Sequence, residues 1–428
     1  MRSQGTGGRL GILVGGGPAP GINAVIHSAT IEACTHGLEV VGIYDGFKHL
    51  IEGRLVSTPL RIGDVSRVHL DGGSILRTAR ANPAKSTESL DRCVSTLKEA
   101  GISSLVGIGG DDTAYSLSRV AVYANEQAGY PLRTVHVPKT IDNDLPLPEG
   151  ISTFGFETAR EVGNRLVMTF MEDALTSQNW FLVVTMGRKT GHLAMGIGKS
   201  SGATLTVIPE EWHGQSVRLQ EVIDILTTAI VLRLAEGKRH GVALIAEGVL
   251  EYMADADLAK LGNLSFDDHG HVRMEEINLS DALKHAVGAE LTRLGVEIGL
   301  RDKELGYELR CAPPIACDID YARSLGEAAV DFLLAGGSAA TITLQRNQVV
   351  PIPAEQMTDP TTGRTEVRVV NLDSFAYASA YKFMIRLKPK HAQDTVLWER
   401  MAGQTNLDTE AFRQRFGYLV GMAPRPWD

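Results

Sequence analysis

Apolar runs rich in β-branched residues alternate with helical patterns along most of this chain. The runs predicted to form strands are "RLGILV", "LEVVGIY", "SSLVGIG", "RTVHV", "WFLVVTM", "ATLTVI" and "GVALIAEG". Between them, apolar positions recur at helical spacing over 21–35, 87–100, 113–126, 156–176 and 219–236. This alternation is typical of doubly wound, mostly parallel sheets whose strands are buried on both faces.

The order of the predicted strands indicates two α/β domains. The runs at 9–14, 103–108 and 133–137 are expected in one sheet, and those at 180–186, 204–208 and 241–247 in a second. A chain of 428 residues is long enough for more than one domain.

Composition narrows the possible partners. The net charge of −9 argues against nucleic acid as the main partner, although local basic groups can still bind an anionic substrate. The four cysteines form no CxxC pair, which argues against a disulfide framework or a structural zinc site. No apolar run reaches the roughly 18 residues of a membrane span, and the first residues lack an apolar targeting core. We therefore expect a cytoplasmic protein without membrane contact.

Ligands of parallel sheets bind where loops follow the carboxyl ends of the strands. The loops in question are "GGGPAPGINA", "GGDDT", "VPKTIDNDLP", "TMGRKTGHL" and "IAEGV". The first is glycine-rich but lacks the third glycine of the dinucleotide fingerprint, because Pro20 stands there. A glycine-rich loop alone fits either a phosphate contact or a plain tight turn.

The "GGDDT" loop allows two interpretations. The amides of Gly109 and Gly110 can meet a phosphate while Asp111 holds a magnesium ion that bridges phosphate oxygens. Alternatively, Asp111 or Asp112 caps the following helix, whose dipole favours both acids.

The "VPKTIDNDLP" loop is harder to explain as structure alone. Asp142 and Asp144 can divide the tasks of taking a proton from an alcohol and orienting the substrate, although a solvated turn is the alternative.

Two other motifs are not interpreted as binding sites. "GIGKSS" at 196–201 has Leu193 where a phosphate-binding loop needs glycine, and "DDHGH" at 267–271 is expected to form an exposed turn rather than a metal site.

An ordered set of motifs resembles the phosphofructokinase family over roughly residues 9–330: "GGGPAPGINA", "GGSILRTAR", "GGDDT", "PKTIDND", "MGRKTGH", "AEG" and "LGYELR". The resemblance implies two Rossmann-like domains with the active site in the cleft between them. It further implies transfer of phosphate to the 1-hydroxyl of fructose 6-phosphate, with magnesium and either ATP or pyrophosphate. We expect a donor domain over 1–150 completed by parts of 320–428, a sugar-phosphate domain over 151–319, and a C-terminal extension over 345–428.

The resemblance also implies roles for individual residues. The donor site would consist of Gly17, Arg80, Gly110, Asp111, Asp112 and Thr113, with Asp111 on magnesium. The fructose 6-phosphate site would consist of Thr140, Asp142, Asp144, Met186, Gly187, Arg188, Glu247, Arg301, Tyr307 and Arg310. Asp142 matches the general base, and Tyr307 and Arg310 match the pair that grips the 6-phosphate. Arg301 matches an arginine supplied by a neighbouring subunit, which predicts a homo-oligomer, either dimer or tetramer.

Two positions predict the phosphoryl donor. ATP-using members have glycine at the positions of Asp112 and Lys139, and pyrophosphate-dependent members carry this Asp and Lys pair. A carboxylate at 112 would repel the α-phosphate of ATP: unit charges about 4 Å apart interact by roughly 4 kcal/mol at an effective dielectric of 20. Lys139 offers a cation to the transferring phosphoryl group. The sequence thus predicts a pyrophosphate-dependent, reversible, glycolytic phosphofructokinase with Asp142, Lys139, Asp112 and Arg188 as catalytic residues. An ATP-dependent member and a non-catalytic sugar-phosphate-binding regulator are the alternatives.

Three positions depart from the shorter, ATP-using members of the family. Asn179 replaces an arginine supplied by the neighbouring subunit, His27 replaces an arginine that binds a nucleotide effector, and Tyr307 replaces a histidine. These changes put effector control of that kind, and one contact to the 6-phosphate, in doubt.

Overall fold

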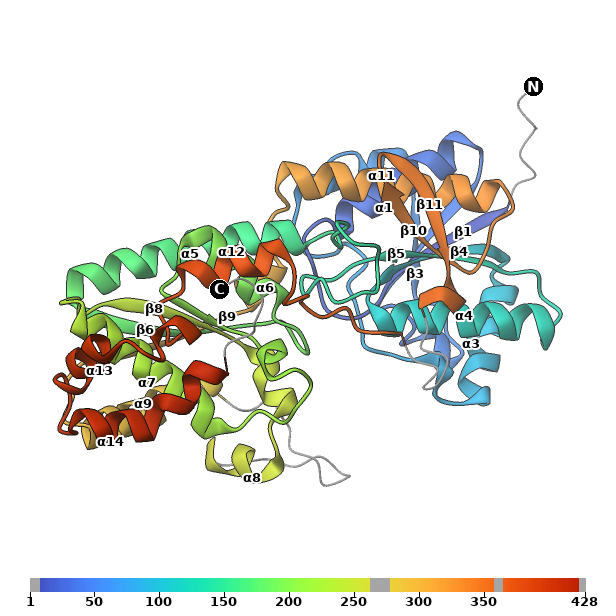
Figure 1. Ribbon diagram of the computed structural model, residues 1–428. Coiled ribbons are helices and arrows are strands. Elements are labelled where there is room, and N and C mark those ends of the chain that lie inside the picture. The colour runs from blue at the N-terminus through green and yellow to red at the C-terminus, as the bar shows by residue number, and fades with distance from the viewer. Residues whose placement is uncertain (1–7, 262–277, 358–364, 423–428) are drawn as a thin grey trace. The chain divides into compact units, whose positions relative to one another are not determined.

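The computed structural model describes residues 8–261, 278–357 and 365–422. The turn expected at 267–271 lies outside these residues. By its contacts the chain divides into two units, Met1–Ala159 with Tyr307–Arg368 and Arg160–Gly306 with Val369–Asp428 (Figure 1). The expected ranges 151–319 and 345–428 are therefore each shared between the two units.

The first unit is built on a seven-stranded sheet with the order β11-β10-β5-β4-β1-β2-β3. Edge strands β3 and β11 are antiparallel to their neighbours, and the other strands run parallel. The strands are β1 (Arg9–Val14), β2 (Glu39–Ile43), β3 (Ser57–Leu60), β4 (Ile102–Gly109), β5 (Arg133–Pro138), β10 (Ala340–Gln345) and β11 (Gln348–Pro353).

Helices cover both faces of this sheet. Helices α1 (Ile22–Thr35) and α11 (Ala316–Leu334) pack together on one face, while α3 (Thr87–Glu99) and α4 (Asp111–Glu126) lie on the other (Figure 1). Successive strand residues point to opposite faces. Accordingly, Ile12 belongs to the core beneath α1 and Leu13 to the core beneath α3. The short helices of this unit are α2 (Ile62–Val65) and α10 (Tyr307–Arg310).

The second unit has a parallel four-stranded sheet with the order β7-β8-β6-β9. Its strands are β6 (Asn179–Thr185), β7 (Leu205–Val207), β8 (Gly241–Ala246) and β9 (Gly299–Leu305). Its helices are α5 (Phe156–Ser177), which begins in the first unit, α6 (His192–Ser201), α7 (Leu219–Ala235), α8 (Asp255–Leu258), α9 (Leu279–Arg293), α12 (Phe375–Phe383), α13 (Thr395–Ala402) and α14 (Thr409–Phe416). Among the described helices, none is both long and apolar enough to cross a membrane.

All the predicted strands and helices are present, with ends displaced by a few residues. Both predicted strand groupings are confirmed, since β1, β4 and β5 share one sheet and β6, β7 and β8 share the other. Four strands were not predicted: β3, β9, β10 and β11. Edge strand β9 has no apolar run, because its sequence is "GLRDKEL" and it buries only Leu305. An exposed edge strand needs no apolar run.

Buried charges attach the C-terminal residues to the second unit. The Glu211 carboxylate accepts hydrogen bonds from Arg386 Nη1 at 2.8 and 2.9 Å and from the Tyr377 hydroxyl at 2.8 Å. Asp224, fully buried in α7, accepts from Arg415 at 3.0 and 3.1 Å and from the Tyr418 hydroxyl at 2.6 Å. Both carboxylates are thereby paired away from water.

A buried histidine links three strands of the first unit. His136 of β5 places Nε2 2.8 Å from the carbonyl oxygen of Gly109 at the end of β4, and Nδ1 3.0 Å from Thr341 Oγ1 in β10. A carbonyl oxygen only accepts, so Nε2 carries the proton and Nδ1 accepts from the hydroxyl. Burial lowers the pKa of His136 to about 4.

The lowered pKa makes the stability of the first unit depend on pH. Between pH 6.5 and 4 the unfolded chain binds a proton at position 136 that the folded chain does not, so stability falls as the pH falls. The shift corresponds to about 3 kcal/mol in the free energy of unfolding. Urea titrations from pH 7 to pH 4 should show a shallower loss of stability in His136→Gln. An unaltered slope in His136→Gln would contradict this account.

Arg386→Met should destabilise the second unit by about 3–5 kcal/mol, because it leaves the buried Glu211 carboxylate without its cation. The control is Arg9→Met. The Arg9–Glu39 pair is 2.7 Å long, but its side chains are 49% and 69% exposed, and we expect a loss below about 1 kcal/mol. Chemical denaturation measures both, and equal losses would show that burial does not set the strength of the pair.

Candidate active site

Three of the predicted loops meet at one edge of the first sheet. Strands β5, β4 and β1 are neighbours and run parallel, with Gly109 opposite Pro138 and Ile108 opposite Val14. The loops that follow these strands therefore leave the sheet side by side. They hold the predicted base and, apart from Arg80, the residues predicted to bind the phosphoryl donor.

Lys139 lies between two of these loops. Its side chain is buried, and Nζ donates a hydrogen bond to the carbonyl oxygen of Gly17 at 2.6 Å. Its backbone amide donates to the carbonyl of Gly109 at 2.9 Å. A Cβ placed on Gly16 would lie 3.3 Å from Nζ, and one on Gly17 would lie 3.6 Å from Arg310 Nη1. The glycine-rich loop thus brings its backbone close to two cations.

The glycines of the donor loops serve two different purposes. A Cβ on Gly15 or Gly109 would lie 2.2 or 2.1 Å from Thr113 Oγ1, so both glycines are needed for Thr113 to pack between the loops. Among the described residues, a Cβ on Gly110 would have one neighbour within 4 Å, the carbonyl oxygen of Lys139 at 3.7 Å. These residues therefore leave room beside Gly110.

Helix α4 is capped by Gly110, and Asp111 and Asp112 both lie in its first turn. The alternative in which one of the aspartates caps the helix is therefore wrong. The helix dipole still favours both acids, and Asp111 is half-buried whereas Asp112 is exposed.

Asp111 fits magnesium only in one kind of site. In the described residues, no three His, Cys, Asp or Glu side chains lie close enough together to hold a metal ion. Magnesium commonly takes one or two carboxylates and completes its shell with water and phosphate oxygens. A single half-buried carboxylate at the start of a helix fits an ion shared with a bound phosphate, and does not fit an ion held by protein alone.

Side chains within the segment support part of the loop after β5. The Asp142 amide donates to Thr140 Oγ1 at 3.0 Å, and Thr153 Oγ1 donates to the Thr140 carbonyl at 2.7 Å. Asn143 has a positive φ of 56°, and its Oδ1 accepts from the Thr153 amide at 3.1 Å. Thr140 and Asp142 are both buried, so the predicted base lies in a defined, largely dehydrated position.

Arg80, Tyr307 and Arg310 also belong to the first unit. Ala79 pairs with Gly15, which places Arg80 directly after a segment attached to the glycine-rich loop. The guanidinium of Arg310 stacks on the ring of Tyr307 at 4.5 Å, and Tyr307 is 73% exposed. Arg310 Nε is buried and makes no hydrogen bond among the described residues.

The remaining predicted sugar-binding residues lie in the second unit. Met186, Gly187 and Arg188 follow β6, and Glu247 follows β8, whose last residue is opposite Thr185 of β6. A Cβ on Gly248 would lie 2.6 Å from the carbonyl oxygen of Arg188, so the two loops pack closely. This part of the predicted set shares one edge of the second sheet.

Arg301 is the exception in this unit. It is exposed and lies opposite Phe181, four residues before the end of β9. At about 3.3 Å per residue, roughly 13 Å of strand separates it from the edge that carries Met186. Its predicted role toward a neighbouring subunit stays a prediction.

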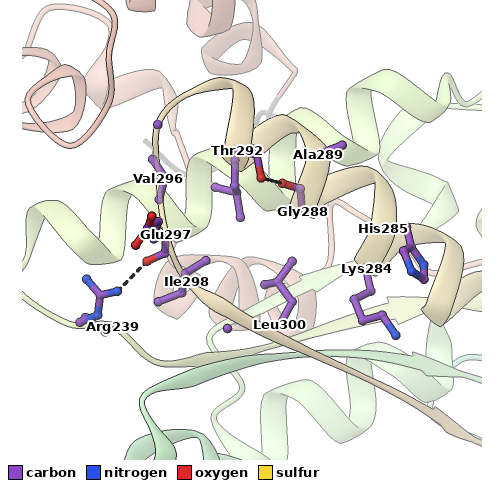
Figure 2. Close-up of a pocket in the computed structure, with 13 residues that line it drawn as sticks. Arg239, Lys284, His285, Gly288, Ala289, Thr292, Val296, Glu297, Ile298 and Leu300 are labelled. Atoms are coloured by element: carbon purple, nitrogen blue, oxygen red, sulfur yellow. Dashed lines mark hydrogen bonds between the residues drawn. The ribbon is translucent and has the colours of Figure 1, made fainter.

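A groove in the second unit contains none of the predicted residues. It lies between α9 and the start of β9, and Figure 2 shows Arg239 facing the backbone carbonyl of Glu297. Arg239 donates to the Glu297 carbonyl at 2.6 Å, and Lys284 donates to Asp281 and Asp302 at 2.6 and 2.7 Å. Since protein groups occupy these cations, the groove is a poor candidate for the phosphate site.

Sequence reasoning missed three residues that contact the predicted loops. His136 holds the Gly109 carbonyl, Thr365 Oγ1 donates to the Asp111 carbonyl at 3.4 Å, and Arg368 contacts the loop after β5. Thr365 and Arg368 belong to no motif, and no spacing in the sequence connects them to the distant loops.

The chain resembles known proteins over nearly its whole length. The phosphofructokinase family model matches residues 9–333. Pyrophosphate–fructose 6-phosphate 1-phosphotransferase of Thermotoga maritima is 50% identical over 418 residues, covering 96% of this chain and 99% of that protein. The protein of the same name from Naegleria fowleri is 44% identical over 423 residues, covering 96% and 95%.

A solved structure supports the fold. The pyrophosphate-dependent phosphofructokinase of Marinobacter aquaeolei aligns with a TM-score of 0.68 at 18% identity, covering 98% of this chain and 94% of that one. Because the family model covers most of the chain and a full-length relative shares half of its residues, this chain belongs to the phosphofructokinase family.

Proposed function

We propose that this protein transfers a phosphoryl group from pyrophosphate to the 1-hydroxyl of fructose 6-phosphate, giving phosphate and fructose 1,6-bisphosphate. The observation that carries the proposal is the buried Lys139 ammonium beside the glycine-rich loop, 2.6 Å from the Gly17 carbonyl, together with Asp112 in the first turn of α4. Full-length relatives named for this activity support it.

At the donor end of the reaction, the main task of the protein would be to stabilise negative charge. Lys139 and Arg80 would offset the negative charge of the transferring group and of the departing phosphate. Asp111 would hold magnesium, which when bound neutralises charge on the donor oxygens. The exposed Asp112 carboxylate would repel the additional phosphate of a nucleotide.

At the acceptor end, the reaction requires a base and residues that bind the sugar phosphate. Asp142 would take the proton of the 1-hydroxyl as that oxygen attacks the phosphorus in line. Thr140, Asp144, Met186, Gly187, Arg188 and Glu247 would hold the sugar, and Tyr307 and Arg310 its 6-phosphate. The buried Arg310 Nε, which has no hydrogen bond in the described part of the chain, supports a polar ligand there.

The cation, the reversibility of the reaction and the oligomeric state are further parts of the proposed function. We propose that the cation is magnesium, that the reaction is reversible and belongs to glycolysis, and that the protein acts in the cytoplasm. We also propose a homo-oligomer in which the exposed Arg301 of one subunit completes the 6-phosphate site of another.

The choice of donor is tested by assaying purified protein with pyrophosphate and with ATP, each with magnesium and fructose 6-phosphate. We expect pyrophosphate to be the better donor. Lys139→Gly should lower kcat/KM for pyrophosphate by about 10²–10³-fold, because a preorganised cation is lost. Adding Asp112→Gly should raise kcat/KM for ATP at least about tenfold, because roughly 1.4 kcal/mol of repulsion suffices for that factor.

The control for these substitutions is Lys98→Ala at an exposed position of α3, which should match the wild type. Preference for ATP in the wild-type protein would support the ATP-dependent alternative. Binding of fructose 6-phosphate without turnover on either donor would support a non-catalytic regulator.

Asp142→Asn should lower kcat by about 10²–10⁴-fold, because an amide of the same shape cannot accept the proton of the sugar hydroxyl. The KM for pyrophosphate should change little, since the predicted donor contacts remain. Steady-state kinetics with both substrates varied would measure this, and a kcat close to that of the wild type would exclude Asp142 as the base.

A further inference from the structure

One arginine beyond the family-matched region contacts the loop that carries the proposed base. The family model ends at residue 333, and Arg368 lies 35 positions farther along the chain (368 − 333). Arg368 is the last residue of the first unit, to which the loop after β5 also belongs. The contact therefore joins two distant segments within one compact unit.

The guanidinium of Arg368 donates hydrogen bonds to Asn143, Leu147 and Ile151 of this loop. Nε and Nη2 donate to the Asn143 carbonyl at 3.1 and 3.0 Å. Nη1 donates to the carbonyls of Ile151 at 2.7 Å and Leu147 at 3.3 Å, and Nη2 also donates to Asn143 Oδ1. The Arg368 amide donates to the Asp144 carbonyl at 2.8 Å.

The loop needs such a partner because it has little structure of its own. Residues 141–152 form neither helix nor strand, so their carbonyls lack the partners that regular structure supplies. Asn143 also holds a left-handed backbone conformation, which a residue with a side chain adopts at a cost unless its surroundings enforce it. A planar guanidinium holds five N–H donors in a fixed arrangement, so it can bond more acceptors at once than the three donors of an ammonium group.

The charge of Arg368 also lies near the carboxylate of a predicted site residue. Arg368 is half-buried, and desolvation lowers its pKa while the nearby Asp144 carboxylate opposes this effect. The same segment also contacts the start of α4, through Thr365 and the Asp111 carbonyl. Residues 365–368 therefore contact both the predicted donor loop and the predicted base loop.

We infer that Arg368 is a positioning residue for phosphoryl transfer, which holds the turn at Asn143 so that Asp142 is presented to the sugar hydroxyl. The inference rests on the proposed function. It assigns a task in the reaction to the C-terminal region that the family motifs do not include. Because Arg368 acts through the loop, its loss should reduce the rate of transfer more than the binding of pyrophosphate.

The primary test is Arg368→Met in the full-length protein, assayed with pyrophosphate, magnesium and fructose 6-phosphate. We expect kcat to fall by about 10²-fold, the effect of a displacement of roughly 1 Å in a reacting group. The KM for pyrophosphate should stay within about threefold, since the predicted donor contacts remain. Arg368→Lys, which keeps the charge but not the planar fork, should lose about tenfold in kcat and serves as the test if the Met variant does not fold.

The control is Arg413→Met, which removes a guanidinium bonded to the Ala392 carbonyl at 2.8 Å in the second unit. It should keep the wild-type kcat. A second readout is rescue of Arg368→Ala: millimolar guanidinium should restore part of kcat, whereas methylammonium should not.

A kcat within twofold of the wild type in the folded variant, with only a lower melting temperature, would overturn the inference, as would an equal response to the two added ions. Failure of the proposed function is distinguishable, because it appears as absence of transfer in the wild-type protein before any substitution is made.

Discussion

The parallel alignment of β5, β4 and β1 is the constraint on which the rest of the candidate site depends. Because these strands run in one direction and end at one level, the loops after them leave the sheet together. Residues more than a hundred positions apart, such as Gly17 and Lys139, then come within hydrogen-bond distance. Glycines at the strand ends make this possible by leaving room for Thr113 and Lys139.

The loop after β5 is held in place from several directions. Thr153 supports it from its own segment, His136 anchors the neighbouring Gly109 carbonyl, and Arg368 satisfies its carbonyls from the far end of the chain. A buried carboxylate needs a fixed environment to act as a base at a defined position. The polar contacts around Asp142 are thus part of its proposed chemistry as well as of the fold.

The C-terminal region serves both units. Residues up to Arg368 belong to the first unit, and those from Val369 onward belong to the second, where Glu211 and Asp224 bind Arg386 and Arg415. Buried ion pairs add little stability over apolar packing, but breaking one is costly because a charge is left without its partner. Loss of either pair would therefore oppose packing of this segment against the second unit.

The sequence by itself determined the α/β class, the predicted strands and their division between two sheets, and the family. Each of these follows from local patterns: apolar runs, helical spacing, and short motifs whose residues are neighbours in the chain. It did not determine β3, β10 and β11, the exposed edge strand β9, which has no apolar run, or the capping of α4 by Gly110. Only the tertiary structure decided which distant residues support the site, notably His136 and Arg368. The physical reason is that most of their partners are backbone carbonyls, which are the same in every sequence, so only the folded path of the chain reveals where the hydrogen bonds form.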